Sequence, residues 1–273
     1  MKKQYRLLRL GAVALFLVGS LFAGQTVSAQ DTELSLQSKV PLGTVPEQAA
    51  SLLRPLVNPE PANDVLQRTG VARLRPVLSS KDMVAEGTVT VYTPSGQRKF
   101  SVTLVQKGQH GSQLILLKQS DGKFWDGNVL HLEAGGRQAL EFLETQHARG
   151  IRLLLGAPAR EATIADNGTQ NMLRSLTVKE KGGDSTQYTL DGSTSRITQF
   201  QFIRGTTRSS GGLLSPAVHS YAFTDVRTAD GIATSFHVEH AVNGAKQEDL
   251  QLTKVNFSSP TLKVPAESTG PQK

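Results

Sequence analysis

Apolar and polar residues alternate along most of the chain after residue 85, which is the pattern of β-strands with one buried face. The clearest run covers residues 219–257, where Asp230-Gly231 and Asn243-Gly244 mark two tight turns and divide the run into three strands. The same alternation predicts earlier strands at 86–92, 98–107, 172–178, 186–190 and 196–204. A long antiparallel meander is therefore the main feature of the chain.

Residues 113–118 break the alternation, because Leu114, Ile115, Leu116 and Leu117 are apolar without a gap. A continuous apolar run is typical of a strand covered on both faces, so we expect a central strand here. Asp121-Gly122 then predicts a type I′ hairpin, with a return strand at 123–126 and a further short strand at 129–132. Asp166-Asn167-Gly168 is interpreted as a turn between later strands.

Helical spacing occurs in two places. Asn63 is a candidate N-cap for a helix over about 62–74, and Gly70 and Pro76 make it either a broken helix or one that ends by Arg75. Ala139, Leu140, Phe142 and Leu143 recur at helical spacing in residues 137–155. Gly150 predicts that this second segment is one interrupted helix or two short ones.

The last strand changes phase. Leu250 and Leu252 share one parity, whereas Val255 and Phe257 share the other. A β-bulge near Lys254 places all four side chains on one face. With about ten or eleven strands and few helices, the chain is predicted to be an α+β domain around one antiparallel sheet, and a sheet of that size tends to curl.

The two ends of the chain do not belong to this pattern. Four basic residues precede an apolar stretch at 11–22, and Val27-Ser28-Ala29 has the small residues of a cleavage site. We therefore expect residues 1–29 to be a signal peptide cleaved after Ala29, which places the mature chain in the periplasm or outside the cell. Residues 30–61 are interpreted as a flexible N-terminal segment and residues 259–273 as a disordered tail.

Composition excludes several classes of protein. The formal charge is +7, but four of the positive charges lie in the predicted signal, which leaves about +3 and no cluster of basic and aromatic residues for nucleic acid. The chain has no cysteine, which removes disulfides, a cysteine-linked lipid anchor and thiolate metal sites. No cofactor is expected.

No catalytic constellation is evident. His237 and His240 are three residues apart in a predicted strand, so they face opposite sides of it. Ser209 and Ser210 lie in a glycine-rich loop at 208–212 that lacks the strand–turn–helix context of a hydrolase serine. We interpret the chain as non-enzymatic. A secreted hydrolase would need a hydroxyl, a histidine and a carboxylate within hydrogen-bond reach of one another.

Two stretches resemble the outer-membrane lipoprotein carrier proteins of the LolA/LolB type. Residues 121–127 are similar to the family's Asp-Gly-aromatic-aromatic hairpin, and residues 221–255 are similar to its closing strands. The resemblance covers roughly residues 62–258. It implies an unclosed β-barrel whose concave, apolar face is covered by helices and accepts acyl chains.

The resemblance also implies a site. Candidate ligand-binding residues are Leu114, Leu116, Phe124, Phe142 and Leu143. Family members carry an arginine that ties the helical lid shut, and Arg73 and Arg75 are the nearest candidates here. The implied partner is a lipid or the acyl chain of a lipoprotein, bound by a monomer. The alternative is a domain on the same fold that docks or senses another envelope protein.

Overall fold

The computed structural model describes residues 49, 52, 53, 55–108, 112–208, 212 and 214–257, all of them within the compact unit Val40–Lys273. The predicted signal peptide, the predicted tail at 259–273 and most of the glycine-rich loop at 208–212 lie outside the described residues. So does most of the predicted flexible segment at 30–61.

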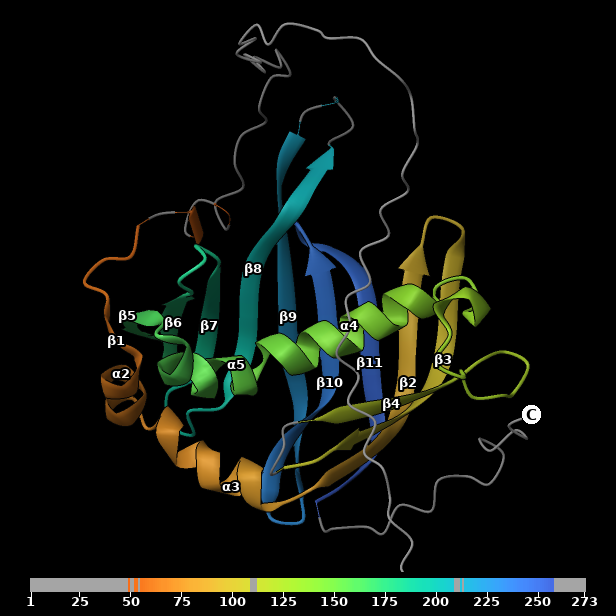
Figure 1. Ribbon diagram of the computed structural model, residues 1–273, viewed down its shortest axis with the longest axis horizontal. Helices are drawn as coiled ribbons and strands as arrows, with labels where there is room; N and C mark the ends of the chain where they lie inside the picture. Colours follow the sequence, from red (N-terminus) through yellow and green to blue (C-terminus); the bar gives the residue numbers. More distant parts are fainter. Residues whose placement is uncertain are drawn as a thin grey trace, which may run out of the picture. The chain divides into compact units, whose positions relative to one another are not determined.

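The fold is one antiparallel sheet that does not close on itself (Figure 1). Its strand order is β1-β5-β6-β7-β8-β9-β10-β11-β2-β3-β4, so β1 and β4 are the two edges. The strands are β1 Glu60–Pro61, β2 Met83–Thr93, β3 Gly96–Gln106, β4 Gln113–Lys118, β5 Thr163–Gln170, β6 Leu173–Lys179, β7 Ser185–Asp191, β8 Ile197–Arg208, β9 Leu214–Ala229, β10 Ile232–Val242 and β11 Ala245–Asn256. The predicted fold class is confirmed.

The helices lie on one face of this sheet (Figure 1). They are α2 Ala62–Arg68, α3 Leu74–Ser80, α4 Gly136–Arg149 and α5 Ile151–Gly156, with 3₁₀ turns η1 Val71–Arg73, η2 Val129–His131 and η3 Ala157–Arg160. Helix α4 crosses the sheet and contacts β2, β4 and β11. The predicted break at Gly150 separates α4 from α5. None of the helices in the described part of the chain is long and apolar enough to cross a membrane.

The prediction that residues 113–118 form a central strand is wrong. Among the described strands, β4 pairs with β3 alone and forms an edge of the sheet. Ile115 and Leu117 face the core, whereas Leu114 lies on the opposite face and is 48% exposed. An unbroken apolar run does not fix the position of a strand within a sheet, because strand order depends on long-range pairing.

The segment after β4 also differs from its prediction. Residues 123–126 form no strand, since only Phe124 makes a bridge to Lys118. Residues 129–131 are the 3₁₀ turn η2 instead of a strand, because the side-chain oxygen of Asn128 accepts a hydrogen bond from the Leu130 amide at 3.0 Å. A capping asparagine at this position favours a turn over an extended chain.

The N-terminal helix is longer and more broken than expected. Gly70 has a φ of 75°, which ends the first helical stretch, and α3 then continues to Ser80. Pro76 does not end it, because a proline in the first turn of a helix lacks only an N–H group that has no partner there. Pro61, not Asn63, occupies the N-cap position of α2.

The two turns of the closing meander are confirmed. Asp230 and Gly231 have φ values of 48° and 79°, and Asn243 and Gly244 have values of 48° and 81°, as a type I′ turn requires. The hairpin at Asp121-Gly122 is not of this type, since only Gly122 has a positive φ. The predicted turn at 166–168 is a bulge inside β5, a strand that the alternation did not reveal.

The predicted bulge near Lys254 is confirmed, because the pairing of β11 with β2 shifts register between Leu252 and Lys254. Leu250, Leu252, Val255 and Phe257 are consequently all buried. The opposing residue is Gly87, and a Cβ atom there would lie 2.3 Å from the backbone oxygen of Gln251. The bulge therefore depends on a residue without a side chain at that position.

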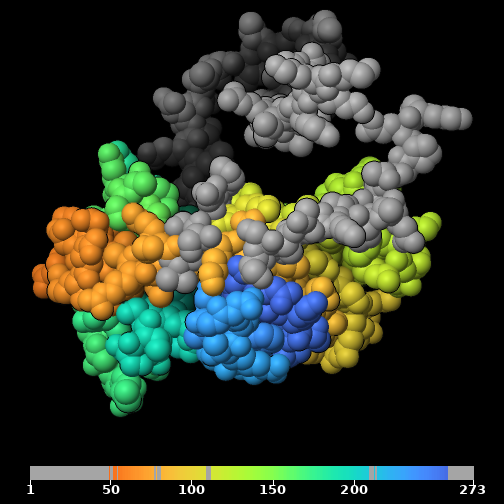
Figure 2. Space-filling model, turned by 90° about the horizontal axis from the view of Figure 1, so that it is seen from below, coloured from red at the N-terminus to blue at the C-terminus, as the bar shows by residue number. Residues whose placement is uncertain are grey.

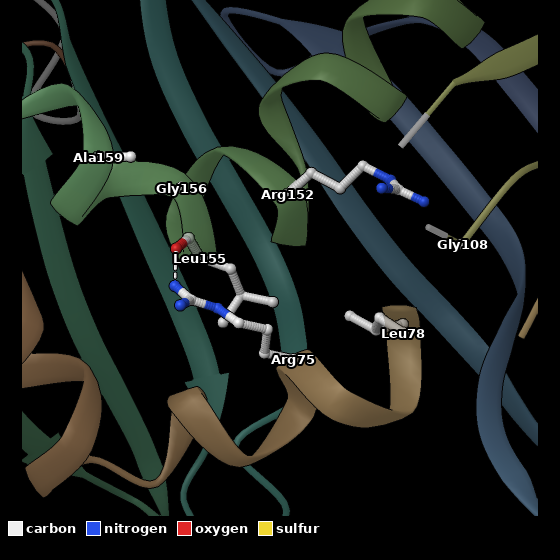
Figure 3. Close-up of a pocket in the computed structure, with 7 residues that line it drawn as sticks. All are labelled: Arg75, Leu78, Gly108, Arg152, Leu155, Gly156 and Ala159. Carbon is white, nitrogen blue, oxygen red and sulfur yellow. Dashed lines mark hydrogen bonds between the residues drawn. The ribbon is translucent and has the colours of Figure 1, made fainter. Parts of the chain in front are cut away.

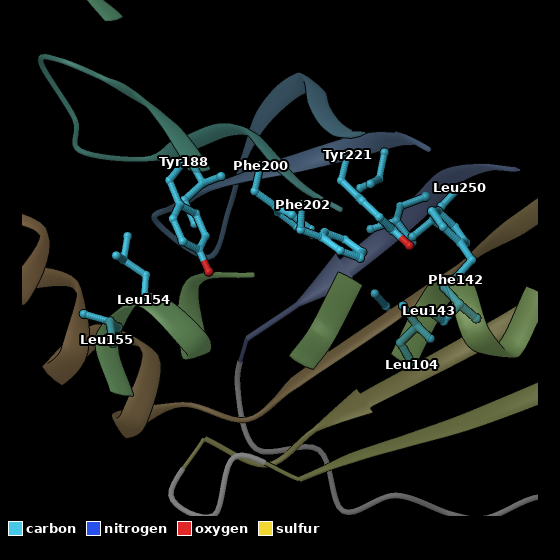
Figure 4. Close-up of a cluster of buried hydrophobic side chains, with 14 of the residues drawn as sticks. Leu104, Phe142, Leu143, Leu154, Leu155, Tyr188, Phe200, Phe202, Tyr221 and Leu250 are labelled. Atoms are coloured by element: carbon cyan, nitrogen blue, oxygen red, sulfur yellow. The ribbon is translucent and has the colours of Figure 1, made fainter. Parts of the chain in front are cut away.

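An aromatic layer holds α4 against the sheet (Figure 4). The ring of Phe142 stacks on Tyr221 at a centroid distance of 5.8 Å, and Tyr221 stacks on Phe200 at 4.7 Å. Tyr188 donates a hydrogen bond from its hydroxyl to the carbonyl oxygen of Arg149 at 2.8 Å, which fixes the end of α4 over β7. Burial holds the pKa of Tyr188 far above its ordinary value, so the hydroxyl keeps its proton and remains a donor.

Candidate functional site

A cleft of about 410 Å³ lies between α3, the junction of α4 with α5, and the strands β2, β3 and β8–β11. Leu74 and Leu78 of α3 form one wall, and Ile151 of α5 forms another. Most of its lining is apolar and comes from six strands and the residue that follows the last of them: Met83, Leu104, Ile197, Phe223, Ile232, Val238, Leu250, Leu252 and Phe257. Figure 2 shows α3 beside the β9–β10 hairpin, the two parts of the chain that flank this cleft.

Local sequence features create this space. Gly150 ends α4, because its ψ of −147° is far from the helical value, so α5 begins in a new direction. The bulge of β11 brings Phe257 to the same face as Leu250 and Leu252. The floor of the cleft is therefore made by buried strand residues, and its rim is made by half-exposed residues such as Ile151 and Ile232.

Two smaller depressions, of about 330 Å³ and about 40 Å³, share Leu78 and Arg152 with the cleft. In the larger of the two, the guanidinium of Arg75 donates a hydrogen bond to the carbonyl oxygen of Leu155 at 2.5 Å (Figure 3). This bond ties α3 to α5 across the mouth. Of the two arginines suggested by the resemblance, Arg75 makes this link, and Arg73 is an exposed residue of η1.

The five residues predicted as a site do not line this cleft. Leu114 and Leu116 lie on the face of β4 opposite to Ile115 and Leu117, which pack against the core. Phe124 is half-buried at its bridge to Lys118. The structure brings Phe142 and Leu143 together in the core under α4, where they are 2% and 0% exposed.

Sequence reasoning missed the residues that do line the cleft. Ile232 follows a type I′ turn and Ile151 follows Gly150, so both stand at the start of an element. An apolar residue at the first position of a strand or helix is only a weak indication that the residue lies at the rim of a cleft. Leu78 could not be assigned to a site, because the predicted N-terminal helix ended before it.

A second polar cluster lies beside α4, on the same face of the sheet. The His240 Nδ1 atom lies 2.5 Å from a carboxylate oxygen of Glu248, and its Nε2 lies 3.0 Å from Nδ1 of His219. The Nε2 of His219 lies 3.2 Å from the carbonyl oxygen of Arg204, which only accepts hydrogen bonds. Burial, reinforced by the positive charge of His240, lowers the pKa of His219 to about 4.

A third cluster tests whether the chain has a hydrolase site. The hydroxyl of Thr224 lies 2.8 Å from Nδ1 of His237, whose Nε2 lies 2.7 Å from a carboxylate oxygen of Asp249. Lys246 also bonds to this carboxylate, at 2.6 Å. None of these residues lines the cleft or the two depressions beside it. The hydrogen bonds of this cluster link β9, β10 and β11. Within the described residues, no group of His, Asp and Glu is arranged to hold a metal ion.

Comparison with known proteins gives structural neighbours only. No protein-family model and no curated protein matches the chain. Similar solved structures include a lipoprotein-sorting protein domain from Vibrio parahaemolyticus, described as putative, with 12% identity, a TM-score of 0.46, and coverage of 71% of this chain and 94% of that one. A DUF1329 family protein from Desulfovibrio piger has 9% identity and a TM-score of 0.44, with 72% and 93% covered.

A LolA superfamily protein from Nitrosomonas europaea is also similar, with 10% identity, a TM-score of 0.43, and 74% and 95% of the two chains covered. At identities of 9–12% this likeness concerns the fold and says nothing about a ligand.

Proposed function

We propose that the chain is a non-enzymatic binding protein that holds an apolar ligand, such as the acyl chain of a lipid or of a lipidated protein. The observation that supports this function is the cleft of about 410 Å³, whose lining is mostly apolar. Its volume falls within the roughly 300–1,000 Å³ of ligand pockets in general. Each methylene group moved from water into such a site contributes about 0.8 kcal/mol.

The rim supplies the surface that a ligand would cover. Ile151, Phe223 and Ile232 line the cleft and are only half-buried, so part of their apolar area faces water in the unliganded protein. An acyl chain lying against them removes this area from water. The hydrogen bond from Arg75 to the carbonyl oxygen of Leu155 links α3 to α5 in the depression beside the cleft.

We also propose that the protein acts in the periplasm, because residues 1–29 have the three parts of an export signal. A carrier in that compartment shields acyl chains from water between two membranes. This proposal is independent of the identity of the ligand. It is tested by fractionation of cells that express the chain and by N-terminal sequencing, for which we expect Gln30 as the first residue.

The test of ligand binding uses two matched tryptophan variants. Ile232→Trp fills the cleft, whereas Leu114→Trp adds the same ring to the opposite face of the sheet. Native mass spectrometry after mild extraction is combined with titration by a fluorescent fatty acid. We expect the wild-type protein and Leu114→Trp to retain the probe and Ile232→Trp to lose it. A wild-type protein that purifies without lipid and ignores the probe would refute the function.

One observation favours the alternative, in which the same fold docks another envelope protein. Strand β4 is an edge of the sheet, and Leu114 on it is 48% exposed. Edge strands offer unpaired backbone groups to an added strand. Two results together would favour this alternative: the wild-type protein does not bind lipid probes, and Leu114→Lys weakens binding of an envelope protein.

A further inference from the structure

The charges around the cleft are all of one sign. The lining of the cleft and its two neighbouring depressions includes Arg75, Lys81, Arg152 and Arg196, and it includes no aspartate or glutamate. An apolar chain alone gives no reason for this arrangement. A cationic rim on an apolar cleft instead fits a ligand with an anionic end.

Three of these four cations bond to neutral groups only. Arg75 donates to the carbonyl oxygen of Leu155, Lys81 approaches the carbonyl oxygen of Asp230 at 3.5 Å, and Arg196 donates to the hydroxyl of Ser235 at 3.2 Å. No carboxylate in the described residues forms an ion pair with any of them. Their charges are therefore available to a ligand.

Arg152 is the cation with the fewest bonds. It lines the cleft and both depressions, and its guanidinium makes no hydrogen bond or ion pair with the part of the chain that the structure describes. Figure 3 shows its side chain extended across the mouth toward Gly108. Partial burial lowers the pKa of Arg152, and no nearby carboxylate opposes this effect.

Asp82 and Asp230 are adjacent in the sequence to residues that line these spaces, and both form other interactions. Asp82 pairs with Lys107 and accepts a hydrogen bond from the Gly108 amide at 3.1 Å. Asp230 accepts a hydrogen bond from the Phe257 amide at 2.7 Å.

The guanidinium of Arg152 is half-buried without a partner among the described residues, which is unfavourable. Its planar group of N–H donors matches the two oxygens of a carboxylate or phosphate.

We propose that the cleft binds an anionic amphiphile, with the acyl chain against the apolar lining and the carboxylate or phosphate head group on Arg152. This inference rests on the proposed function and adds the class of head group. The two head groups share the same chemistry, since each presents paired anionic oxygens. The apolar lining requires that the anion be attached to a hydrocarbon chain, so free phosphate is not the ligand.

The experiment compares a fluorescent fatty acid with its methyl ester, which has the same chain without the charge. We expect the wild-type protein to bind the acid about tenfold more tightly or better, because a charge-assisted hydrogen bond is lost with the ester. Arg152→Gln should remove this preference and leave the affinity for the ester unchanged. Arg152→Lys should restore part of it, because the charge remains but the fork does not.

The control is Arg137→Gln, which removes the same charge from an exposed position on α4 outside the cleft. It should keep the full preference for the acid.

Competition with hexadecyl phosphate distinguishes a phosphate head group from a carboxylate head group, because it measures how well the alkyl phosphate displaces the fluorescent fatty acid. Inorganic phosphate should not displace the fatty acid. Equal binding of acid and ester by the wild-type protein would overturn the inference and leave the proposed function intact. Binding of neither probe would overturn the proposed function itself.

Discussion

Phe142 separates two accounts of helix α4, because the sequence motifs suggest it as a ligand-binding residue and the structure places it in the core. Its side chain is 2% exposed and stacks on Tyr221 at 5.8 Å and on His240 at 6.2 Å. Phe142→Ala removes a buried ring and leaves a cavity, which costs about 3–5 kcal/mol. The lost ring contacts, at about 0.5–1.5 kcal/mol per aromatic pair, place the expected value in the upper part of that range.

The assay is urea unfolding at pH 7, with Glu141→Ala as the matched control on the exposed side of the same helix. The control should change the free energy of unfolding by no more than about 0.5 kcal/mol. If Phe142→Ala does not fold, Phe142→Leu gives a smaller loss that can still be measured. A loss below about 1 kcal/mol for Phe142→Ala, with weaker binding of the fluorescent fatty acid, would refute the account and make α4 a lid over a cavity.

Three further predictions concern single residues. Arg75→Met removes the hydrogen bond to the Leu155 carbonyl oxygen and should lower the free energy of unfolding by about 0.5–1.5 kcal/mol. Amide hydrogen exchange in α5 should become faster. Unchanged exchange would contradict the link between α3 and α5. Gly87→Ala places a Cβ atom against the Gln251 backbone and should cost about 1–3 kcal/mol in urea unfolding; a neutral result would contradict the close approach. The pKa of His219 is lowered from 6.5 to about 4 in the folded protein, so between these pH values the unfolded chain binds this proton more tightly than the folded protein does. Stability should therefore fall as pH drops from 6.5 toward 4, by about 1–2 kcal/mol after allowance for partial exposure, and His219→Gln should show a smaller fall in urea unfolding across the same range.

Features that depend on neighbouring residues were predictable from the sequence. Asp230-Gly231 and Asn243-Gly244 form the expected turns, and the structure shows both to be of type I′, in which two consecutive positive φ values favour residues of this kind. The phase shift between Leu252 and Val255 indicates a bulge, because the side-chain period of a strand is two. The break at Gly150 was likewise predictable.

Features that depend on distant parts of the chain were not predictable. Strand β4 is an edge because β2 pairs with β11, and no local pattern carries that information. Strand β5 was missed because its bulge, with Gly168 at a φ of 88°, looks like a turn. The cleft combines Leu78, Ile151 and Ile232 from three separate elements. The motifs indicate the fold but not which apolar residues remain half-exposed once it is formed.

The central claim is that the cleft between α3, α5 and the β9–β10 hairpin holds an acyl chain. Photo-crosslinking with a diazirine fatty acid, followed by peptide mapping, tests it most directly. The account predicts labels on peptides that contain Ile151 and Ile232, which line the cleft. Labels confined to the peptide with Leu114 and Leu116, on the opposite face of the sheet, would contradict it.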